Sequence, residues 1–308
     1  MLSRRHIRLK VMQSLYSFFT LKGDIYASQK MMLKHIDEVK TLYLIIISLL
    51  NELIKYADIF FDQAKNKHFP TADDLNPNRR LTNNVLFKYL LDDKELISKA
   101  EKVSDIWLKN DHDIISKLFK NLYKSDLYKN YILNHDNSIE VDQKFISNAI
   151  NENLLNNELV HHILEEKSIY WVDDLPFVAT IIIGNFKLNS DMNIKNVFKD
   201  NSDRTFAIQL FRGTIDKNLE YDKIIEKFSS NWELTRIAIM DKIFLKMALT
   251  EILTMEELPI KVSMNEYIEI SKYYSTAKSK LFVNGMLDNI VKSFKNQGML
   301  QKTGKGLL

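Results

Sequence analysis

The sequence contains no cysteine, and only seven of its 308 residues are glycine and four are proline. Without thiols the chain can form no disulfide, no thiolate metal site and no cysteine nucleophile, which fits a reducing compartment. Folds rich in β-sheet need a turn about every 8–12 residues, and turns are rich in glycine and proline. The shortage of both residues therefore predicts a mainly helical protein.

The chain also lacks a long uninterrupted apolar segment. Its most apolar run, LYLIIISLL at residues 42–50, is well short of the ~20 residues that a membrane-spanning helix requires. The basic start MLSRRHIRLK is followed by an amphipathic segment and by no cleavage site, so it does not have the pattern of an export signal. We therefore expect a soluble, cytoplasmic protein with no membrane segment.

The chain has only a small excess of positive charge, but the positively charged residues are concentrated near its start. The net charge of +3 is too small to indicate a nucleic-acid partner by itself. The first ten residues, however, contain Arg4, Arg5, Arg8 and Lys10 and no acidic residue. Positive charge at the start of a helix opposes the helix dipole at a cost of about 0.3–1 kcal/mol. The cluster is therefore easier to explain by an anionic partner than by helix stability.

The apolar pattern predicts helices along most of the chain. Residues 3–21 form an amphipathic helix with Ser3 as N-cap and Ile7, Val11 and Leu15 on the apolar face. We expect one or two helices over 25–63, a loop after them, and several helices over 84–186 that are broken at 134–138. The pattern leaves helix and strand undecided for 177–186.

The C-terminal third predicts three more helices. The first begins after Trp232, and the last spans about 279–294. Between them, Ser263 and Glu266 have the spacing of a capping box that would begin the second helix. Gly285 stands inside the last helix, where glycine costs about 1 kcal/mol relative to alanine.

This third of the chain resembles the NusB family of transcription antitermination factors. The resemblance rests on NWELTRIAIMDKIFLKMALTEIL (231–253), on the Pro-x-Lys-Val-x-x-Asn-Glu pattern at 259–266, and on Phe-Val-Asn-Gly at 282–285. FAIQLFRGT (206–214) and the arginine-rich RRHIRLKVMQSLYSF (4–18) resemble other helices of the family. The resemblance implies an all-α, NusB-like helical bundle, in which Gly285 would let two helices approach closely.

The resemblance covers about residues 1–24 and 201–296 and leaves a long middle segment unexplained. We therefore expect an N-terminal arginine-rich helix (1–24), a large and mainly helical insertion of unknown fold and role (25–200), a C-terminal NusB-like helical subdomain (201–296) and a flexible tail (297–308). A typical family member has only a short connection in place of the insertion. Whether the insertion covers the family's RNA or NusE surface stays open.

The resemblance implies an antitermination factor that binds boxA-type single-stranded RNA with ribosomal protein NusE in the RNA polymerase antitermination complex and promotes read-through of ribosomal RNA operons. Such an RNA site needs cations, aromatic rings and amides. The first helix offers them from its own sequence, and by resemblance the last helices add more. The expected RNA-binding residues are Arg4, Arg5, Arg8, Gln13, Tyr16, Lys278, Lys280 and Phe282. Asp241 and Lys242 are the expected NusE contacts, which could equally form a solvated face; a homodimer stays open.

Two other interpretations are weighed against this one. An RNA methyltransferase would need a Gly-x-Gly-x-x-Gly turn, which the seven glycines do not form, so we expect no enzyme and no cofactor. Glu158 and His161 have the spacing of a di-iron motif without a second copy, so we expect no metal. The stronger alternative is a protein–protein adaptor on a NusB-like scaffold that does not bind RNA.

Overall fold

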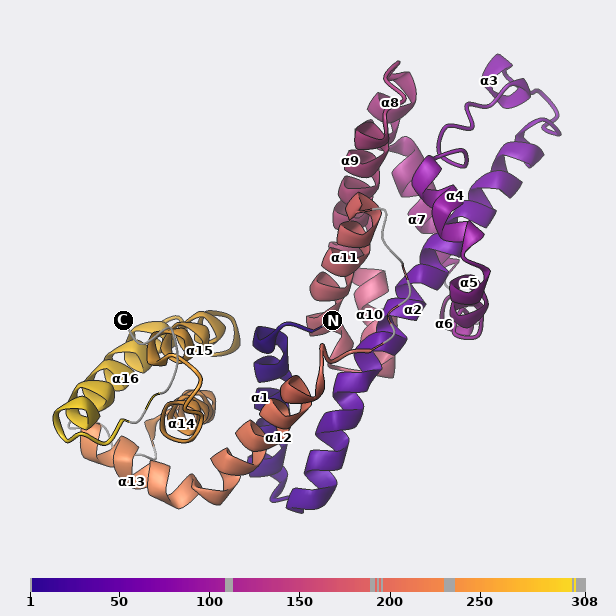
Figure 1. The fold of residues 1–308 in the computed structure, drawn as a ribbon. Coiled ribbons are helices and arrows are strands. Elements are labelled where there is room, and N and C mark those ends of the chain that lie inside the picture. The colour runs from indigo at the N-terminus through magenta and orange to yellow at the C-terminus, as the bar shows by residue number, and fades with distance from the viewer. Residues whose placement is uncertain are drawn as a thin grey trace. The chain divides into compact units, whose positions relative to one another are not determined.

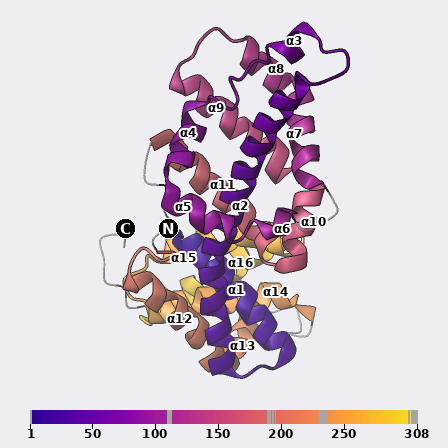
Figure 2. The same ribbon diagram turned by 90° about the vertical axis from the view of Figure 1, so that its right-hand side faces the viewer.

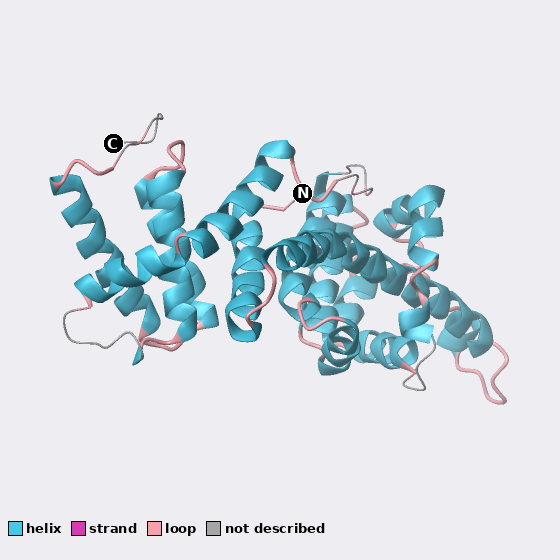
Figure 3. Cartoon of the chain, turned by 90° about the horizontal axis from the view of Figure 1, so that it is seen from below, coloured by secondary structure: helices cyan, strands magenta, loops and turns pink. Residues whose placement is uncertain are grey.

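The computed structural model describes residues 2–108, 113–188, 192, 194, 196–229, 236–300 and 302. Every regular element in these ranges is helical, and no strand is drawn among them (Figures 1 and 3). The all-α prediction is confirmed. The chain divides into two compact units, which we name the terminal unit (1–36 and 196–308) and the middle unit (37–195).

The terminal unit contains both ends of the chain. Its helices are α1 (Arg4–Leu21), the beginning of α2 (Ile25–Ala64), α12 (Asn201–Asp216), α13 (Asn218–Phe228), α14 (Ile239–Thr254), α15 (Ile260–Tyr274) and α16 (Ser279–Asn296). The division between the units falls inside α2, after Ile36, rather than at residue 24, and the second division falls at 196.

The middle unit contains the rest of α2 and a series of mostly shorter helices. They are α3 (Ala72–Leu75), α4 (Val85–Asp92), α5 (Lys94–Glu101), α6 (Asp105–Leu108), α7 (Ile114–Lys124), α8 (Asp126–Leu133), α9 (Ile139–Ile150), the π-helix η1 (Asn151–Leu155), α10 (Glu158–Lys167) and α11 (Trp171–Leu188). The break at 134–138 lies between α8 and α9, as expected. The segment 177–186, which the pattern left undecided, is helical.

In the middle unit, α2 passes among the shorter helices (Figure 2), and aromatic side chains hold the core against it. Trp107 is buried, and its indole N–H donates to the backbone oxygen of Ile45 at 3.0 Å. The ring of Phe119 lies 5.1 Å from that of Phe60 and 5.7 Å from that of Tyr123, centre to centre. Ring pairs at these separations add to the free energy of burying the rings themselves.

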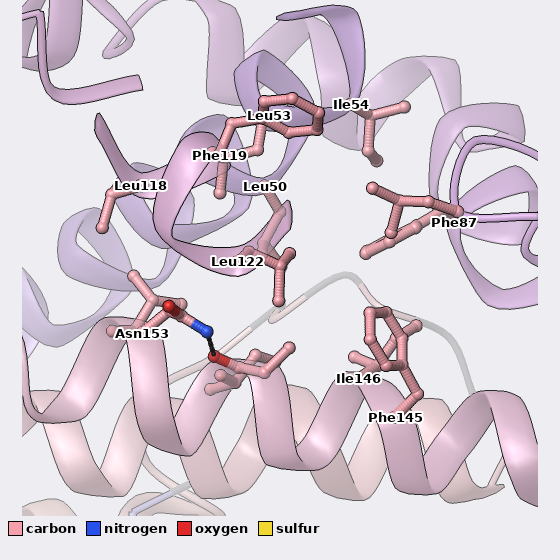
Figure 4. A pocket seen from close by; sticks show the side chains of 14 residues that line it. Leu50, Leu53, Ile54, Phe87, Leu118, Phe119, Leu122, Phe145, Ile146 and Asn153 are labelled. Carbon is pink, nitrogen blue, oxygen red and sulfur yellow. Dashed lines mark hydrogen bonds between the residues drawn. The ribbon is translucent and has the colours of Figure 1, made fainter. Parts of the chain in front are cut away.

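A small apolar pocket lies in this core, between α2, α4, α7, α9 and η1. Leu50, Phe87, Leu122 and Phe145 point towards it in Figure 4. Its lining includes the polar side chain of Asn153, whose amide donates to the backbone oxygen of Ala149 at 3.3 Å. A pocket with this lining is part of the core packing of the middle unit.

In the terminal unit, α1 packs against α12 and α14 (Figure 1). Ser3 is the N-cap of α1, and its hydroxyl oxygen accepts from the backbone N–H of His6. Ile7, Val11 and Leu15 are fully buried, which confirms the apolar face read from the sequence. Full burial of one such side chain stabilises a fold by about 1.5–3 kcal/mol.

Helix α14 lies at the centre of this unit and contacts α1, α12, α13, α15 and α16. It is buried on nearly all sides, because polar as well as apolar side chains along it are covered. It begins at Ile239, several residues later than the predicted start after Trp232, which lies outside the described residues. Ala238 precedes it with an extended backbone, at ψ 140°.

The predicted capping box at Ser263 and Glu266 is wrong. Helix α15 begins at Ile260, and its N-cap is Pro259, four residues before Ser263. Ser263 is therefore inside the helix and fully buried, and its hydroxyl donates to the carboxylate of Glu251 on α14 at 2.6 Å. The Ser263 hydroxyl therefore binds Glu251 of α14 in place of the predicted contact with the backbone of Glu266.

The explanation expected for Gly285 is wrong as well. A Cβ built at Gly285 would meet no atom within 4 Å, so no helix approaches closely there. The close approach occurs instead at Gly213 on α12, where a Cβ would lie 2.8 Å from Cγ2 of Thr250 on α14. The neighbouring Thr214 hydroxyl lies 3.0 Å from the Thr250 hydroxyl, and both side chains are fully buried.

Within the described residues, no single helix is long and apolar enough to cross a membrane. Helices α10 and α11 meet that length and composition only when taken together, as a pair bent by 116°.

Candidate nucleic-acid interface

The first turns of α1 carry Arg4, Arg5 and Arg8. Because residues three and four apart lie on the same side of a helix, Arg4, Arg5 and Arg8 project from adjoining arcs of α1. Each arginine meets a carboxylate from a different helix of the terminal unit: Asp203 on α12, Glu266 on α15 and Glu251 on α14. The three ion pairs tie α1 to the helices formed by the other end of the chain.

The pair between Arg8 and Glu251 is buried. The Arg8 side chain is 3% exposed and that of Glu251 is 0% exposed. Nε and Nη2 of Arg8 donate to the two carboxylate oxygens at 2.7 and 2.8 Å, in the two-bond geometry that a guanidinium favours. Ser263 and Tyr267 on α15 donate to the same carboxylate. Four hydrogen bonds from α1 and α15 thus satisfy the buried charge.

The surroundings of Arg8 keep its guanidinium charged. Burial lowers the pKa of Arg8, but the hydrogen bonds and the charge of Glu251 outweigh burial, so the pKa stands above its ordinary value. Burial, and then the charge of Glu251, raises the pKa of Tyr267 well above its ordinary value, so its hydroxyl keeps the proton that it donates. The Arg8 guanidinium also lies 5.2 Å from the centre of the Phe206 ring.

The other two pairs lie nearer to solvent. Nε and Nη2 of Arg5 donate to the carboxylate of Glu266, each at 2.8 Å, and the Arg5 side chain is 51% exposed. Arg4 donates to Asp203 at 3.1 Å and is 40% exposed. Hydrogen bonding from Arg5 holds the pKa of the Glu266 carboxyl below its usual range.

These pairs correct the interpretation of the arginine cluster. From the sequence, the absence of acidic residues in the first turn of α1 favoured an anionic partner over helix stability. The carboxylates of Asp203, Glu251 and Glu266 supply the missing negative charge from helices distant in sequence. The expectation that Arg8 contacts RNA directly is also corrected, because its buried guanidinium is engaged by Glu251.

A second group of cations lies on α15 and α16. Nζ of Lys272 donates to both carboxylate oxygens of Glu269, at 2.5 Å. The pKa of the Glu269 carboxyl is lowered first by this hydrogen bonding and then by the charges of Lys272, Lys280 and Arg5. Arg5 from α1 and Lys280 from α16 therefore act on one carboxylate of α15, and so the structure brings these two predicted RNA-binding residues into one neighbourhood.

The remaining predicted RNA-binding residues are spread more widely. Gln13 and Tyr16 follow Arg5 along α1 by about 12 and 16 Å of helix rise; Gln13 is half-buried and Tyr16 is 43% exposed. Lys278 is exposed at the N-cap of α16. Phe282 is half-buried in the first turn of that helix, between a core position and a fully exposed one.

The two residues expected to contact NusE differ in exposure. Asp241 is buried, and its carboxylate accepts hydrogen bonds from Ser275 at 2.6 Å and Ser279 at 2.9 Å. It thereby joins the start of α14 to the connection that leads into α16. This internal role corrects the expectation of a direct partner contact for Asp241. Lys242, beside it, is half-buried.

Sequence reasoning missed several residues of this region. Asp203 and Glu251 were not singled out, and Glu266 was assigned only to a capping box. Glu251 stands in the apolar run ALTEIL, where an isolated acid signals a buried partner. Tyr273, at the end of α15, is 80% exposed and follows Lys272 directly. An aromatic residue beside a lysine is a signal of a nucleic-acid contact that the sequence analysis did not use.

No metal-binding cluster of three or more His, Cys, Asp or Glu side chains occurs among the residues that the structure describes. Near the Glu158 motif, His162 lies 3.4 Å from Glu166, one helical turn away, with both side chains more than half exposed. This contact is a surface pair on α10.

Comparison with known proteins adds the family context. The model of the NusB family matches residues 184–292, which span the end of α11 and most of the helices from α12 to α16. No solved structure matches the chain.

Three curated relatives are each named transcription antitermination protein NusB. The one from Salinibacter ruber is 52% identical over 110 residues, which are 36% of this chain and 69% of that protein. The one from Chloroherpeton thalassium is 41% identical over 114 residues, 37% of this chain and 54% of that protein. The one from Thermodesulfovibrio yellowstonii is 42% identical over 99 residues, 32% of this chain and 66% of that protein.

Proposed function

Because this chain belongs to the NusB family, we propose that it is an RNA-binding transcription antitermination factor. It binds boxA-type single-stranded RNA together with ribosomal protein NusE, within the RNA polymerase antitermination complex, and promotes read-through of ribosomal RNA operons. The relatives' names support antitermination; the RNA element and the partner follow from the resemblance. The matched segments cover between 54% and 69% of those relatives.

One observation carries the RNA part of the proposal. Arg5 on α1 and Lys280 on α16 lie close enough to act on the same carboxylate of Glu269, and both cations reach solvent. Single-stranded RNA is bound where cations that face phosphates lie beside rings that stack on bases. Phe282, two residues after Lys280, and the half-exposed Tyr16 are the rings that we assign to this surface.

The set of residues that we assign to direct RNA contact is smaller than the set expected from the sequence, because it omits Arg8. Arg4 and Arg5 are retained, because both are at least 40% exposed, and so are Gln13, Tyr16, Lys278, Lys280 and Phe282. Arg8 acts indirectly by fastening α1 to α14 and α15. Lys242 is the retained NusE contact.

The test is a titration of boxA RNA, with and without NusE, against full-length protein in which Arg4 and Arg5 are both replaced by alanine. We expect weaker binding and a shallower dependence on salt, by about 0.7 in the logarithmic slope for each lost phosphate contact. Glu266→Gln is the matched control: it frees Arg5 from its ion pair, so RNA affinity should be kept or increased. Unchanged affinity and slope in the double variant would remove the start of α1 from the mechanism.

The adaptor alternative has an observation in its favour. All three arginines of the cluster are already paired with carboxylates of the same unit, so their charge is accounted for without RNA. An adaptor would bind NusE with the same affinity whether or not boxA RNA is present, and would not retain the RNA alone. The same titration therefore separates the two functions.

A further inference from the structure

The exposed ring of Tyr273 stands out on the terminal unit. Single exposed apolar side chains are common on protein surfaces and need no explanation by themselves. What distinguishes Tyr273, at 80% exposure, is its position at the end of α15, directly after Lys272. Glu266 and Glu269 precede it by seven and four residues, a spacing that places all three on one side of the helix.

Cations line this side of α15 from three helices. Arg5 from α1 pairs with Glu266, Lys272 of α15 pairs with Glu269, and Lys280 of α16 adds its charge at Glu269. The three cations exceed the two carboxylates, so this part of the surface carries net positive charge. Lys272 is the neighbour of Tyr273 in sequence, and the pKa of Lys272 is raised chiefly by its hydrogen bond to Glu269 and in part by its proximity to Tyr273.

We propose that Tyr273 is a base-stacking residue that extends the RNA surface by one unpaired nucleotide, with Lys272 and Lys280 binding the adjoining phosphate. The inference rests on the proposed function and adds a contact to it. A phenol ring held at the end of a helix loses little conformational freedom on stacking, and every base offers a face to stack on. The lysines beside the ring supply positive charge, which favours a ligand that carries phosphate over an apolar partner.

The experiment compares two RNAs on the full chain with NusE: a minimal boxA segment, and the same segment lengthened by two unpaired nucleotides at each end. We expect Tyr273→Ala to weaken binding of the longer RNA by about 5-fold or more, which corresponds to the lower end of stacking energies. Tyr273→Phe keeps the ring and should bind as the unchanged protein does. Replacing the stacked nucleotide by an abasic one should abolish the difference between the unchanged protein and the Tyr273→Ala variant.

Salt dependence separates stacking from charge. Tyr273→Ala should leave the logarithmic salt slope unchanged, whereas Lys280→Ala should reduce it by about 0.7 for one phosphate. Tyr26→Ala is the matched control, since Tyr26 is an exposed tyrosine of the same unit that already lies against Arg212. It should bind both RNAs as the unchanged protein does.

The outcomes are distinguishable. If the unchanged protein binds boxA RNA and Tyr273→Ala binds each of the two RNAs as tightly as the unchanged protein does, the Tyr273 contact is overturned and the proposed function stands. If Tyr273→Ala loses affinity for NusE but not for RNA alone, the ring belongs to a protein interface and the inference is overturned. If the unchanged protein retains no RNA, both the inference and the RNA part of the proposed function fail.

Discussion

Arg8 donates two hydrogen bonds to Glu251, and neither side chain is exposed by more than 3%. The two residues are 243 positions apart in sequence. A buried pair of this kind contributes little net stability compared with apolar residues of similar size, but removing one partner leaves a charge buried and uncompensated. The pair therefore specifies where α1 docks on α14.

Replacing Arg8 by methionine should destabilise the terminal unit strongly. Methionine keeps much of the apolar stem of the side chain but leaves the Glu251 carboxylate without its counter-charge, which costs about 3–5 kcal/mol. Urea unfolding followed by circular dichroism measures this cost. Arg4→Met, at a pair that is 40% exposed on the arginine side, should cost no more than about 1 kcal/mol. Equal costs for the two variants would contradict the structural role given to Arg8.

His6 should make stability depend on pH in the mildly acidic range. Burial, and then the charges of Arg5 and Lys10, lowers the pKa of His6 from 6.5 to about 4. As pH falls from about 6.5 to about 4, the unfolded chain takes up a proton that the folded chain does not, so stability is lost across that window. His6→Gln should reduce this loss. Titration of the imidazole by NMR checks the shift, and a value near 6.5 would refute it.

Two of the helical glycines, Gly213 and Gly285, should respond oppositely to alanine. At Gly213 the new Cβ would lie 2.8 Å from Cγ2 of the buried Thr250, and such overpacking costs about 1–3 kcal/mol. At Gly285 no atom lies within 4 Å of the new Cβ, so alanine should stabilise the helix by about 0.5–1 kcal/mol. Thermal unfolding of both variants decides the matter. A lower melting temperature for Gly285→Ala would mean that the open space is filled in solution.

Asp241→Ala should destabilise the start of α16. The change removes the acceptor of two hydrogen bonds from Ser275 and Ser279, and unsatisfied buried groups cost about 1–3 kcal/mol. Lys242→Ala, at the neighbouring half-buried position, should change stability by no more than about 0.5 kcal/mol. Thermal unfolding measures both. If Asp241→Ala instead weakened NusE binding without lowering the melting temperature, the carboxylate would be a partner contact after all.

The sequence pattern predicted correctly those features, such as the N-cap and apolar face of α1, that depend on residues close together in the chain. The spacing of Ile7, Val11 and Leu15 and the Ser3 cap fixed the position of α1, because both depend on residues within a few turns. The Ser263 capping box failed for the opposite reason. Glu251, from another helix, binds the hydroxyl that the box would have used, and no rule of spacing contains that contact.

The candidate site was predictable in its residue types and less so in its geometry. The resemblance placed cations on both the first helix and the last, and Arg5 and Lys280 do share a neighbour in Glu269. Which arginine is buried could not be read from the sequence, because the answer depends on where Glu251 and Glu266 lie after folding. The sequence shows Tyr273 beside Lys272, but the 80% exposure of its ring depends on how α15 packs in the fold.

The long separation between Arg8 and Glu251 also sets an order of events during synthesis. At about 5–20 residues added per second, Glu251 follows Arg8 out of the ribosome by about 12–50 s. All residues of the middle unit are translated within that interval. The helices of the middle unit can therefore fold on the nascent chain before Glu251 is available to pair with Arg8 of α1. The terminal unit is then the last to complete its fold.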